Sequence, residues 1–277
     1  MNQLSDRLNR LSPSATLAMS QKSSELKAQG VDVINLSVGE PDFNTPDHIK
    51  AAAVKAVEEN YSRYSPVPGY PALREAISAK LKNENGLDYA PAQILCSNGA
   101  KQSVCNAIMA LVNAGDEVII PAPFWLSYPE IVKLAGGVPV IVKTTKEQNY
   151  KLTVDDLKAA ITDKTKALVL NTPNNPTGML YTEEELRAIA EVVVANDFYV
   201  VADEMYENLV YGEQKHVSIA SLGKDIYDRT ITCSGVAKSY AMTGWRIGYT
   251  GSSKEIAKMM GSVQSHQTVS YTHLTLP

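Results

Sequence analysis

The sequence has few of the features that would point to an extracellular, metal-binding or membrane protein. Its 277 residues include three cysteines, Cys96, Cys105 and Cys233, an odd number without the spacing of a disulfide framework or a zinc site. We therefore expect no metal site. No apolar run is long enough to span a bilayer, and residues 1–8 lack the apolar stretch of a secretory signal. These absences favour a cytoplasmic protein.

A strong charge of either sign and the common nucleotide motifs are also missing. The net charge of −4 and the pI near 5.7 argue against nucleic acid or an anionic membrane as the main partner. The glycine spacing of neither the Walker nor the Rossmann motif is present, which argues against nucleoside triphosphates and dinucleotides. A composition of 44% hydrophobic and 20% charged residues is typical of a soluble globular protein.

From residue 94 onward, short apolar runs alternate with amphipathic stretches. The pattern predicts helices separated by strands near residues 94–96, 117–121, 138–143, 167–170 and 198–203. Ahead of this pattern, Val31–Leu36 is expected to form a short strand. The continuous apolar run Ala167–Leu170 is typical of a strand covered on both faces. Thr182 and Glu185 form a capping box that opens a helix. The sequence therefore predicts an α/β fold, with a mostly parallel sheet and helices on both faces.

An unusual lysine lies in the loop between two further expected strands. Lys238 stands among small and hydroxyl residues in the segment Cys233–Gly248, and Arg246 follows in the same segment. A lysine without local acidic neighbours can lose its charge by desolvation and act as an amine nucleophile. The alternative is a solvated surface lysine, because lysine is rarely buried without a partner.

Other polar residues follow the expected strands at their carboxyl ends, where ligands bind in α/β sheets. Gly99–Lys101 opens a helix whose free amides can bind a phosphate, although Asn-Gly before a helix is also a common turn. Asn171–Gly178 contains two prolines and can orient amides towards a ligand or simply connect two elements. Asp203 ends an apolar run, so we expect a buried carboxylate that needs a cation, such as the protonated ring nitrogen of a cofactor.

Seven motifs in order resemble the class I and II aminotransferases of fold type I, which depend on pyridoxal phosphate. They are Ser37-x-Gly39-Glu-Pro-Asp, Tyr64 with Gly69, Ser97–Gln102, Pro123–Tyr128, Asn174–Gly178, Ala202–Tyr206 and the Lys238 loop with Met242-Thr-Gly-Trp-Arg246. The resemblance covers residues 12–267, and the bacterial aspartate aminotransferases are the nearest subgroup.

The resemblance implies roles for the residues that contact the cofactor. Lys238 would form the aldimine with pyridoxal phosphate and then shuttle a proton as general base and acid. Asp203 would pair with the pyridinium nitrogen, while Asn175 and Tyr206 would hydrogen-bond the phenolic oxygen. The resemblance assigns the catalytic roles to Lys238, Asp203 and Tyr206.

The resemblance also implies sites for the phosphate and the substrate. The phosphate would be held by Gly99, Ala100, Lys101, Ser234, Arg246 and a Tyr64 from a second subunit. Trp125 would stack on the cofactor ring, although a plain core aromatic is the alternative. The substrate would lie beside Gly39, Trp125 and Asn175, with Lys101 and Thr16 recognising a distal carboxylate.

The implied activity is a ping-pong transfer of the amino group of an L-amino acid, aspartate, to 2-oxoglutarate by a homodimer with shared active sites. An aromatic or prephenate aminotransferase and a C–S lyase of the same fold are alternatives. A non-catalytic protein that keeps the fold is a further one, but the complete set of cofactor residues argues against it.

The resemblance also divides the chain. We expect residues 1–45 to form an N-terminal arm and part of a small domain, and residues 46–267 to form the large domain that binds pyridoxal phosphate. Residues 268–277 depart from the family pattern and are interpreted as a non-native tail. The family's small domain and its carboxylate-binding arginine would lie beyond the point where the pattern breaks off, so we expect this chain by itself to be inactive and not a competent aminotransferase.

Overall fold

The computed structural model describes residues 5–36 and 38–267. The strands are β1 (Ile94–Asn98), β2 (Glu117–Ala122), β3 (Val138–Lys143), β4 (Thr165–Asn171), β5 (Tyr199–Asp203), β6 (Thr230–Gly235) and β7 (Ile247–Gly251). The α-helices are α1 (Asp6–Asn9), α2 (Ala15–Ala28), α3 (Asp47–Glu58), α4 (Pro71–Asn85), α5 (Ala100–Leu111), α6 (Ser127–Leu134), α7 (Val154–Ala160), α8 (Glu183–Ala195), α9 (Lys224–Arg229) and α10 (Lys254–Gln267). Short 3-10 turns are η1 (Pro91–Gln93), η2 (Ile219–Leu222) and η3 (Thr243–Trp245).

The strands form one seven-stranded sheet in the order β1-β7-β6-β5-β4-β2-β3. The pairs β2–β3, β2–β4, β4–β5 and β5–β6 are parallel, whereas β7 is antiparallel to both β6 and β1. The mostly parallel sheet predicted from the sequence is therefore confirmed, with one reversed strand near its β1 edge.

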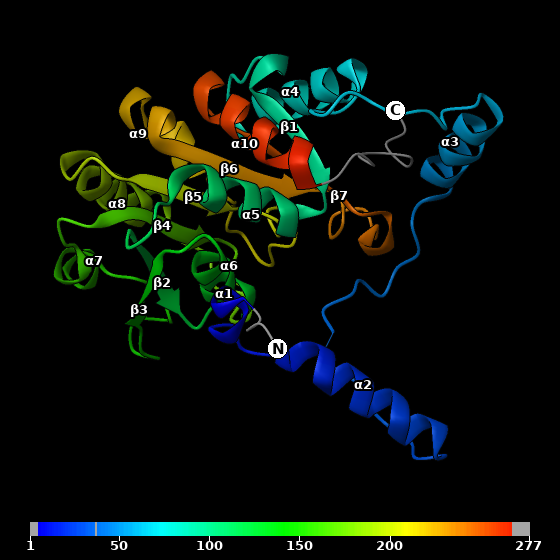
Figure 1. The fold of residues 1–277 in the computed structure, drawn as a ribbon, viewed down its shortest axis with the longest axis horizontal. Helices are drawn as coiled ribbons and strands as arrows, with labels where there is room; N and C mark the ends of the chain where they lie inside the picture. The colour runs from blue at the N-terminus through cyan, green and yellow to red at the C-terminus, as the bar shows by residue number, and fades with distance from the viewer. Residues whose placement is uncertain (1–4, 37, 268–277) are drawn as a thin grey trace.

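Helices cover both faces of the sheet (Figure 1). On one face, α5, α6 and α10 enclose a core that includes Val104, Ile108, Ile131, Val132, Ile256 and Met260. On the other face, α7, α8 and α9 contribute Leu157, Leu186, Ile189 and Ile226 to a second core. Helix α4 covers the β1–β7 end of the sheet with its own Ile77 and Leu81. The fold is thus a three-layer α/β arrangement.

The two cores receive alternate residues of the same strand. In β4, Ala167 and Val169 belong to the first core, and Leu168 and Leu170 belong to the second. Side chains of a strand point alternately to opposite faces, so a strand between two helical layers must be apolar throughout. This explains the uninterrupted apolar run seen in the sequence.

Local signals fix the ends of the helices as expected. The Thr182 side chain accepts a hydrogen bond from the Glu185 amide, and the Glu185 side chain accepts one from the Thr182 amide, which confirms the capping box at the start of α8. Helix α4 begins with Pro71 and ends at Gly86, whose φ of 69° suits a glycine.

Only part of the N-terminal region contacts this body: the Ser12 amide donates to Oε2 of Glu130 on α6 at 2.9 Å, and Thr45 bonds to Ala241. Helix α2 projects outward, and residues 31–36 and 38–46 run without regular structure up to α3 (Figure 1). The short strand expected at Val31–Leu36 is wrong, because this segment lies beside no other strand that could complete a hydrogen-bonded ladder.

Two further expectations are not decided by the fold. The division at residue 45 stays a prediction, and the proposed tail, residues 268–277, lies outside the described residues. Within the part of the chain that the structure describes, no helix is long and apolar enough to cross a membrane.

Candidate active site

The polar residues singled out from the sequence collect at one end of the sheet. Asn171 and Asp203 are the last residues of β4 and β5 and stand side by side in the parallel register, and Asp203 in turn faces Cys233 of β6. The loops that carry Asn175, Tyr206 and Lys238 leave the sheet from these strand ends. The sheet therefore brings together residues that are distant in the sequence.

Asp203 is a buried carboxylate that has no cationic partner among residues 5–36 and 38–267. It is 6% exposed, and it accepts hydrogen bonds from the Tyr128 hydroxyl at 2.7 Å and from the Met205 amide at 3.2 Å. Burial raises the pKa of Asp203, these two hydrogen bonds lower it, and the neighbouring Glu204 raises it. No lysine, arginine or histidine is among the groups that shift it. A protonated ring nitrogen would supply the missing positive charge.

Lys238 is a half-buried amine in the loop after β6. Its Nζ donates a hydrogen bond to the carbonyl oxygen of Gly39 and lies 5.8 Å from the centre of the Tyr206 ring. Burial lowers the pKa of Lys238, Glu40 raises it, and Arg246 lowers it, with a net decrease. The amine therefore becomes neutral at a lower pH than a free lysine, as a nucleophile requires.

Asn175 and Tyr206 approach each other from neighbouring loops. The Asn175 amide nitrogen Nδ2 donates to the Tyr206 hydroxyl at 3.3 Å, and the Asn175 backbone amide donates to Oδ1 of Asn171 at 2.6 Å. Burial raises the pKa of Tyr206 and the Asp203 charge raises it further, so its phenol stays protonated. The pair presents an amide and a hydroxyl that could both donate to one acceptor oxygen.

The start of α5 forms a cradle closed by Arg246. Gly99 precedes the helix with a φ of 76°, and a Cβ added to it would lie 2.2 Å from Nη2 of Arg246. A Cβ on Gly248 would lie 2.3 Å from the Ala100 amide, so β7 also passes close to this helix start. The Gly99 amide donates to the Ser97 carbonyl at 2.8 Å, so the amides that follow it at the start of α5, the helix dipole and the guanidinium are the groups that suit a phosphate.

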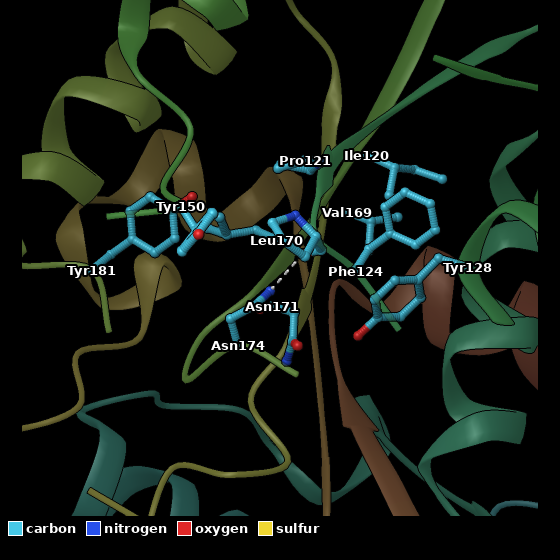
Figure 2. A pocket seen from close by; sticks show the side chains of 11 residues that line it. Ile120, Pro121, Phe124, Tyr128, Tyr150, Val169, Leu170, Asn171, Asn174 and Tyr181 are labelled. Carbon is cyan, nitrogen blue, oxygen red and sulfur yellow. Dashed lines mark hydrogen bonds between the residues drawn. The ribbon is translucent and has the colours of Figure 1, made fainter. Parts of the chain in front are cut away.

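Trp125 lies between the strand-end residues and Lys101. Its ring packs edge-on to Tyr128 with centroids 5.2 Å apart, and the Lys101 Nζ is 5.1 Å from its centre. Tyr128 and Phe124 line the same small cavity beyond β2, next to Asn174, whose Nδ2 donates to the carbonyl oxygen of Pro123 (Figure 2). Trp125 is only partly buried, so its ring is accessible to a ligand.

Three expected residues are not brought into this cluster. Thr16 is exposed on α2, and Tyr64 is 84% exposed in the loop before α4. Ser234 is buried, and its hydroxyl donates to Oε1 of Glu207 at 2.9 Å. A phosphate role for Ser234 or Tyr64 and a substrate role for Thr16 stay predictions.

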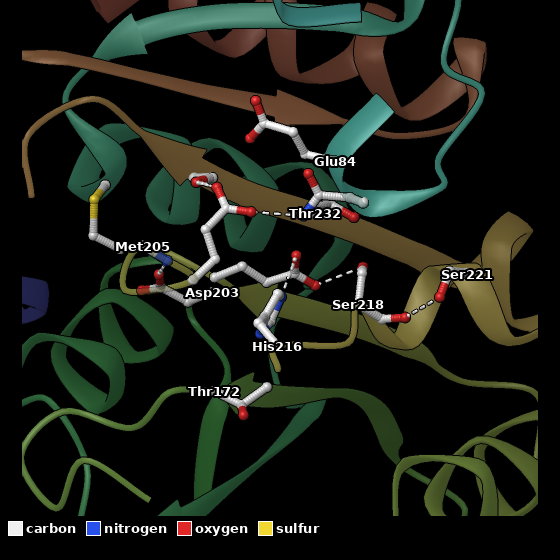
Figure 3. A network of polar contacts seen from close by, with 12 residues as sticks. Glu84, Thr172, Asp203, Met205, His216, Ser218, Ser221 and Thr232 are labelled. Atoms are coloured by element: carbon white, nitrogen blue, oxygen red, sulfur yellow. Dashed lines mark hydrogen bonds and ion pairs between the residues drawn. The ribbon is translucent and has the colours of Figure 1, made fainter. Parts of the chain in front are cut away.

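The sequence reasoning missed a network of buried polar side chains behind the site (Figure 3). Glu204 accepts hydrogen bonds at Oε1 from Ser218 and pairs at Oε2 with Nε2 of His216 at 3.0 Å. Glu207 accepts from Lys80 and Asn85, both at 2.6 Å. Glu204 directly follows Asp203, the last residue of β5, and Glu207 lies three residues further along the same loop, so their position at a strand end was the available signal.

Glu204, Glu207 and His216 also bring three metal-ligating atoms within 4.8 Å of one another. Lys80 and Asn85 already occupy the Glu207 carboxylate, and Ser218 occupies Glu204. The ammonium supplies the positive charge that a metal would supply, so the cluster is best described as a buried ion-pair network.

The residues of this site fit pyridoxal phosphate. The uncompensated Asp203 suits a pyridinium nitrogen, the Asn175–Tyr206 pair suits a phenolic oxygen, and the cradle at Gly99 and Arg246 suits a phosphate. Lys238 offers an amine whose pKa is lowered. These features rest on four different loops, which makes a chance arrangement a poor explanation.

Comparisons with known proteins agree with this description. The family model "Aminotransferase class I and II" matches residues 31–276. The aspartate aminotransferase of Geobacillus stearothermophilus is 51% identical over 271 residues, which are 98% of this chain and 69% of that protein. A probable aspartate/prephenate aminotransferase of Rhizobium leguminosarum bv. phaseoli is 51% identical, over 98% of this chain and 68% of its own.

A solved structure shares the fold. The aspartate aminotransferase of Thermus thermophilus with maleate superposes with a TM-score of 0.95 at 46% identity, over 99% of this chain and 71% of that chain. The chain thus spans about seven-tenths of the length of these relatives.

Proposed function

The chain belongs to the class I and II aminotransferases, and from that premise we propose that it binds pyridoxal phosphate and transfers the amino group of L-aspartate to 2-oxoglutarate. The observation that carries the proposal is the buried carboxylate of Asp203, which no lysine, arginine or histidine of the described residues pairs with, at a strand end near Tyr206, whose ring lies 5.8 Å from Nζ of Lys238. A carboxylate held there without a partner is costly unless a cation completes the site.

Pyridoxal phosphate, when bound, supplies an electron sink for the electron pair released at the substrate Cα. Asp203 would keep the ring nitrogen protonated, which the two hydrogen bonds to its carboxylate support by favouring the ionised form. Asn175 and Tyr206 would hold the phenolic oxygen from one side. The protein groups thus orient the ring and hold the proton that makes it electron-withdrawing.

Lys238 would carry the cofactor and then move a proton at the substrate Cα. A base must be neutral to accept a proton, and the lowered pKa of Lys238 increases the neutral fraction at a given pH. Its present hydrogen bond to the Gly39 carbonyl places the amine on the side from which residues 38–46 approach, where the substrate is expected. Release of this contact would free the amine for chemistry.

Gly99, Ala100 and Arg246 would bind the phosphate. The cradle offers backbone amides at the start of a helix of 12 residues, together with a guanidinium that can donate two parallel hydrogen bonds. Lys101 follows in the first turn and lies over Trp125, so it could serve either the phosphate or a distal carboxylate of the substrate.

The substrate assignment rests on Lys101 and on the relatives. Two relatives carry the name aspartate aminotransferase, and a third the name aspartate/prephenate aminotransferase. Prephenate, like aspartate, has two carboxylates, so Lys101 is compatible with both. A prephenate aminotransferase is therefore the second candidate.

We also propose that two copies of the chain complete the site. Ile34, Leu36 and Phe43 are 85%, 90% and 83% exposed, and Tyr64 is equally open. A run of large apolar side chains left in water favours an interface, and Tyr64 would then reach the phosphate of the other subunit. Sedimentation of the chain with and without pyridoxal phosphate tests this assembly.

A single-turnover assay tests the activity. The chain is loaded with pyridoxal phosphate, and L-aspartate, L-phenylalanine or L-alanine is added in excess. Conversion of the bound cofactor to its amino form, with release of the matching oxo acid, is expected fastest with L-aspartate. A faster reaction with L-phenylalanine would favour an aromatic aminotransferase, and failure of the chain to bind pyridoxal phosphate would contradict the proposal.

A further inference from the structure

Arg246 is held in an unusual backbone conformation at the end of the turn that follows Lys238. Its φ is 58° and its ψ is 51°, the left-handed region that non-glycine residues rarely adopt. Ala241, at the start of the same turn, has a φ of 51°. Such conformations persist only where surrounding contacts enforce them, so two of them in six residues require an external restraint.

This conformation has a consequence for the phosphate cradle. It directs the Arg246 guanidinium across the turn, where Nη1 donates to the Thr243 carbonyl at 2.8 Å and Nη2 lies against Gly99. In an ordinary right-handed or extended conformation the side chain would leave the backbone in a different direction. The backbone of the turn therefore determines whether the guanidinium reaches the start of α5.

Thr45, in the segment just before α3, restrains the Ala241–Arg246 turn. Its hydroxyl donates to the Ala241 carbonyl at 2.6 Å and accepts from the Trp245 indole nitrogen at 3.1 Å. One hydroxyl thus joins the first residue of the turn to the residue before Arg246. A second contact, from the Thr243 hydroxyl to Oε1 of Glu40 at 3.1 Å, is weaker support because it lies at the exposed surface.

Packing contributes little to this attachment. A hollow lined by Phe43, Ala53, Gly244 and other residues opens between residues 43–45, α3 and the turn. Few apolar groups can therefore hold the two segments together at this place. Polar contacts connect the two segments instead: Lys238 donates to the Gly39 carbonyl and Thr243 to Glu40, while the Thr45 hydroxyl alone among them contacts both Ala241 and Trp245.

We propose that Thr45 is a positioning residue for the phosphate: it holds the Ala241–Arg246 turn so that Arg246 faces Gly99. The inference rests on the proposed function for the identity of the ligand. Thr45 itself does not touch the phosphate, and it acts through Arg246. Loss of its hydroxyl should therefore weaken the binding of ligands that carry a phosphate. It should leave the binding of pyridoxal, which has the same ring without a phosphate, nearly unchanged.

The test measures binding of pyridoxal phosphate, pyridoxal and inorganic phosphate to the chain without substrate. Thr45→Val keeps the size of the side chain and removes both hydrogen bonds. We expect this substitution to lower the affinity for pyridoxal phosphate about ten-fold, which corresponds to ~1.4 kcal/mol of binding free energy. The affinity for inorganic phosphate should fall by a similar factor, whereas the affinity for pyridoxal should change less than about two-fold. Thr45→Ser keeps the hydroxyl and should bind all three ligands as the wild type does.

Two controls separate positioning from general stability. Thr230→Val removes a comparable hydroxyl, which donates to the Ile226 carbonyl at 2.7 Å at the far end of β6, and it should change none of the three affinities. In an Arg246→Ala background, Thr45→Val should have no further effect on phosphate binding, because the two residues act in series.

Several outcomes would overturn the inference. One is that Thr45→Val lowers the affinities for pyridoxal and pyridoxal phosphate equally, and another is that it changes no affinity. A third is that the effects of Thr45→Val and Arg246→Ala on phosphate binding add fully in the double variant. If the wild-type chain binds no pyridoxal phosphate, the proposed function fails, and the inorganic phosphate titration then decides the role of Thr45 alone. Absence of phosphate binding as well would overturn both.

Discussion

The hydroxyl of Tyr128 donates a hydrogen bond to Oδ2 of Asp203 across 2.7 Å. Tyr128 belongs to α6 and Asp203 to the end of β5, so a helix on one face of the sheet supports a carboxylate at the carboxyl end of the central strand. The bond favours the ionised form of a group whose pKa burial otherwise raises. It thereby prepares Asp203 to pair with a cation.

Removal of this donor should weaken the cofactor site in a pH-dependent way. Tyr128→Phe is expected to lower the affinity for pyridoxal phosphate by at least about ten-fold, because a hydrogen bond to a charged group contributes about 1.5–3 kcal/mol. The pKa of Asp203 should rise further, so the loss of affinity on acidification should begin at a higher pH than in the wild type. Titrations between pH 5 and 8 measure both effects.

A buried tyrosine elsewhere serves as the control for this variant. The Tyr181 hydroxyl accepts a hydrogen bond from the Leu152 amide at 2.7 Å and does not touch Asp203. Tyr181→Phe should lower stability without shifting the pH dependence of binding. Identical pH profiles for Tyr128→Phe and the wild type would show that the bond does not tune Asp203.

The glycine before α5 should be sensitive to a single methyl group. Gly99→Ala would place a Cβ 2.2 Å from the Arg246 guanidinium, so we expect pyridoxal phosphate to bind at least about ten-fold more weakly. Gly212→Ala is a matched control, since Gly212 also has a positive φ, 85°, but nothing within 4 Å of its added Cβ. Equal effects of the two substitutions on binding would mean that backbone strain, and not the cradle, is responsible.

The pH at which Lys238 attaches to the cofactor should depend on Glu40. Burial lowers the pKa of Lys238, and Glu40 partly opposes this by raising it. Glu40→Gln removes that opposition, so the neutral amine should form at a lower pH than in the wild type, and both midpoints should lie below the value of about 10.4 for free lysine. The rate of covalent attachment of pyridoxal phosphate as a function of pH measures the shift, and a shift to higher pH would contradict the account.

His216 should stabilise the fold in mild acid. Burial lowers the pKa of His216, whereas the charge of Glu204 and its hydrogen bond raise it. Glu207 also raises this pKa and Lys80 lowers it, and the net effect is an increase. The stabilisation is therefore complete below the unfolded pKa of about 6.5 and is lost as the pH rises through the higher folded pKa.

Urea unfolding at pH 5.5 and 8.5 tests this sign. The free energy of unfolding lost in His216→Gln should be larger at pH 5.5 than at pH 8.5. A larger loss at pH 8.5 would mean that His216 is neutral in the folded chain.

Much of the fold follows from local patterns. The apolar run at Ala167–Leu170 and the capping box at Thr182 depend only on neighbouring residues, and both lie where the sequence predicted them. Val31–Leu36 has the same strand-like composition, yet it forms no strand, because pairing depends on a partner that composition does not reveal. A strand-like composition thus predicts a strand only where a neighbouring strand is available to pair with the segment.

The site could be predicted only in part for the same reason. Lys238, Asp203 and Arg246 are recognisable from their positions after strands and from their motifs. The bond from Tyr128 to Asp203 joins residues 75 positions apart, and that from Thr45 to Ala241 joins residues 196 positions apart. Such contacts depend on how helices and loops pack onto the sheet, so a strand-end motif alone does not show them.

The central claim is that Lys238 is the residue that carries pyridoxal phosphate. The chain loaded with the cofactor is reduced with borohydride, which fixes the cofactor to its lysine, and the labelled peptide is identified by mass spectrometry. We predict a single pyridoxyl group on Lys238 and none in Lys238→Ala. A label on Lys101 or any other lysine, or no label on the wild-type chain, would contradict the account.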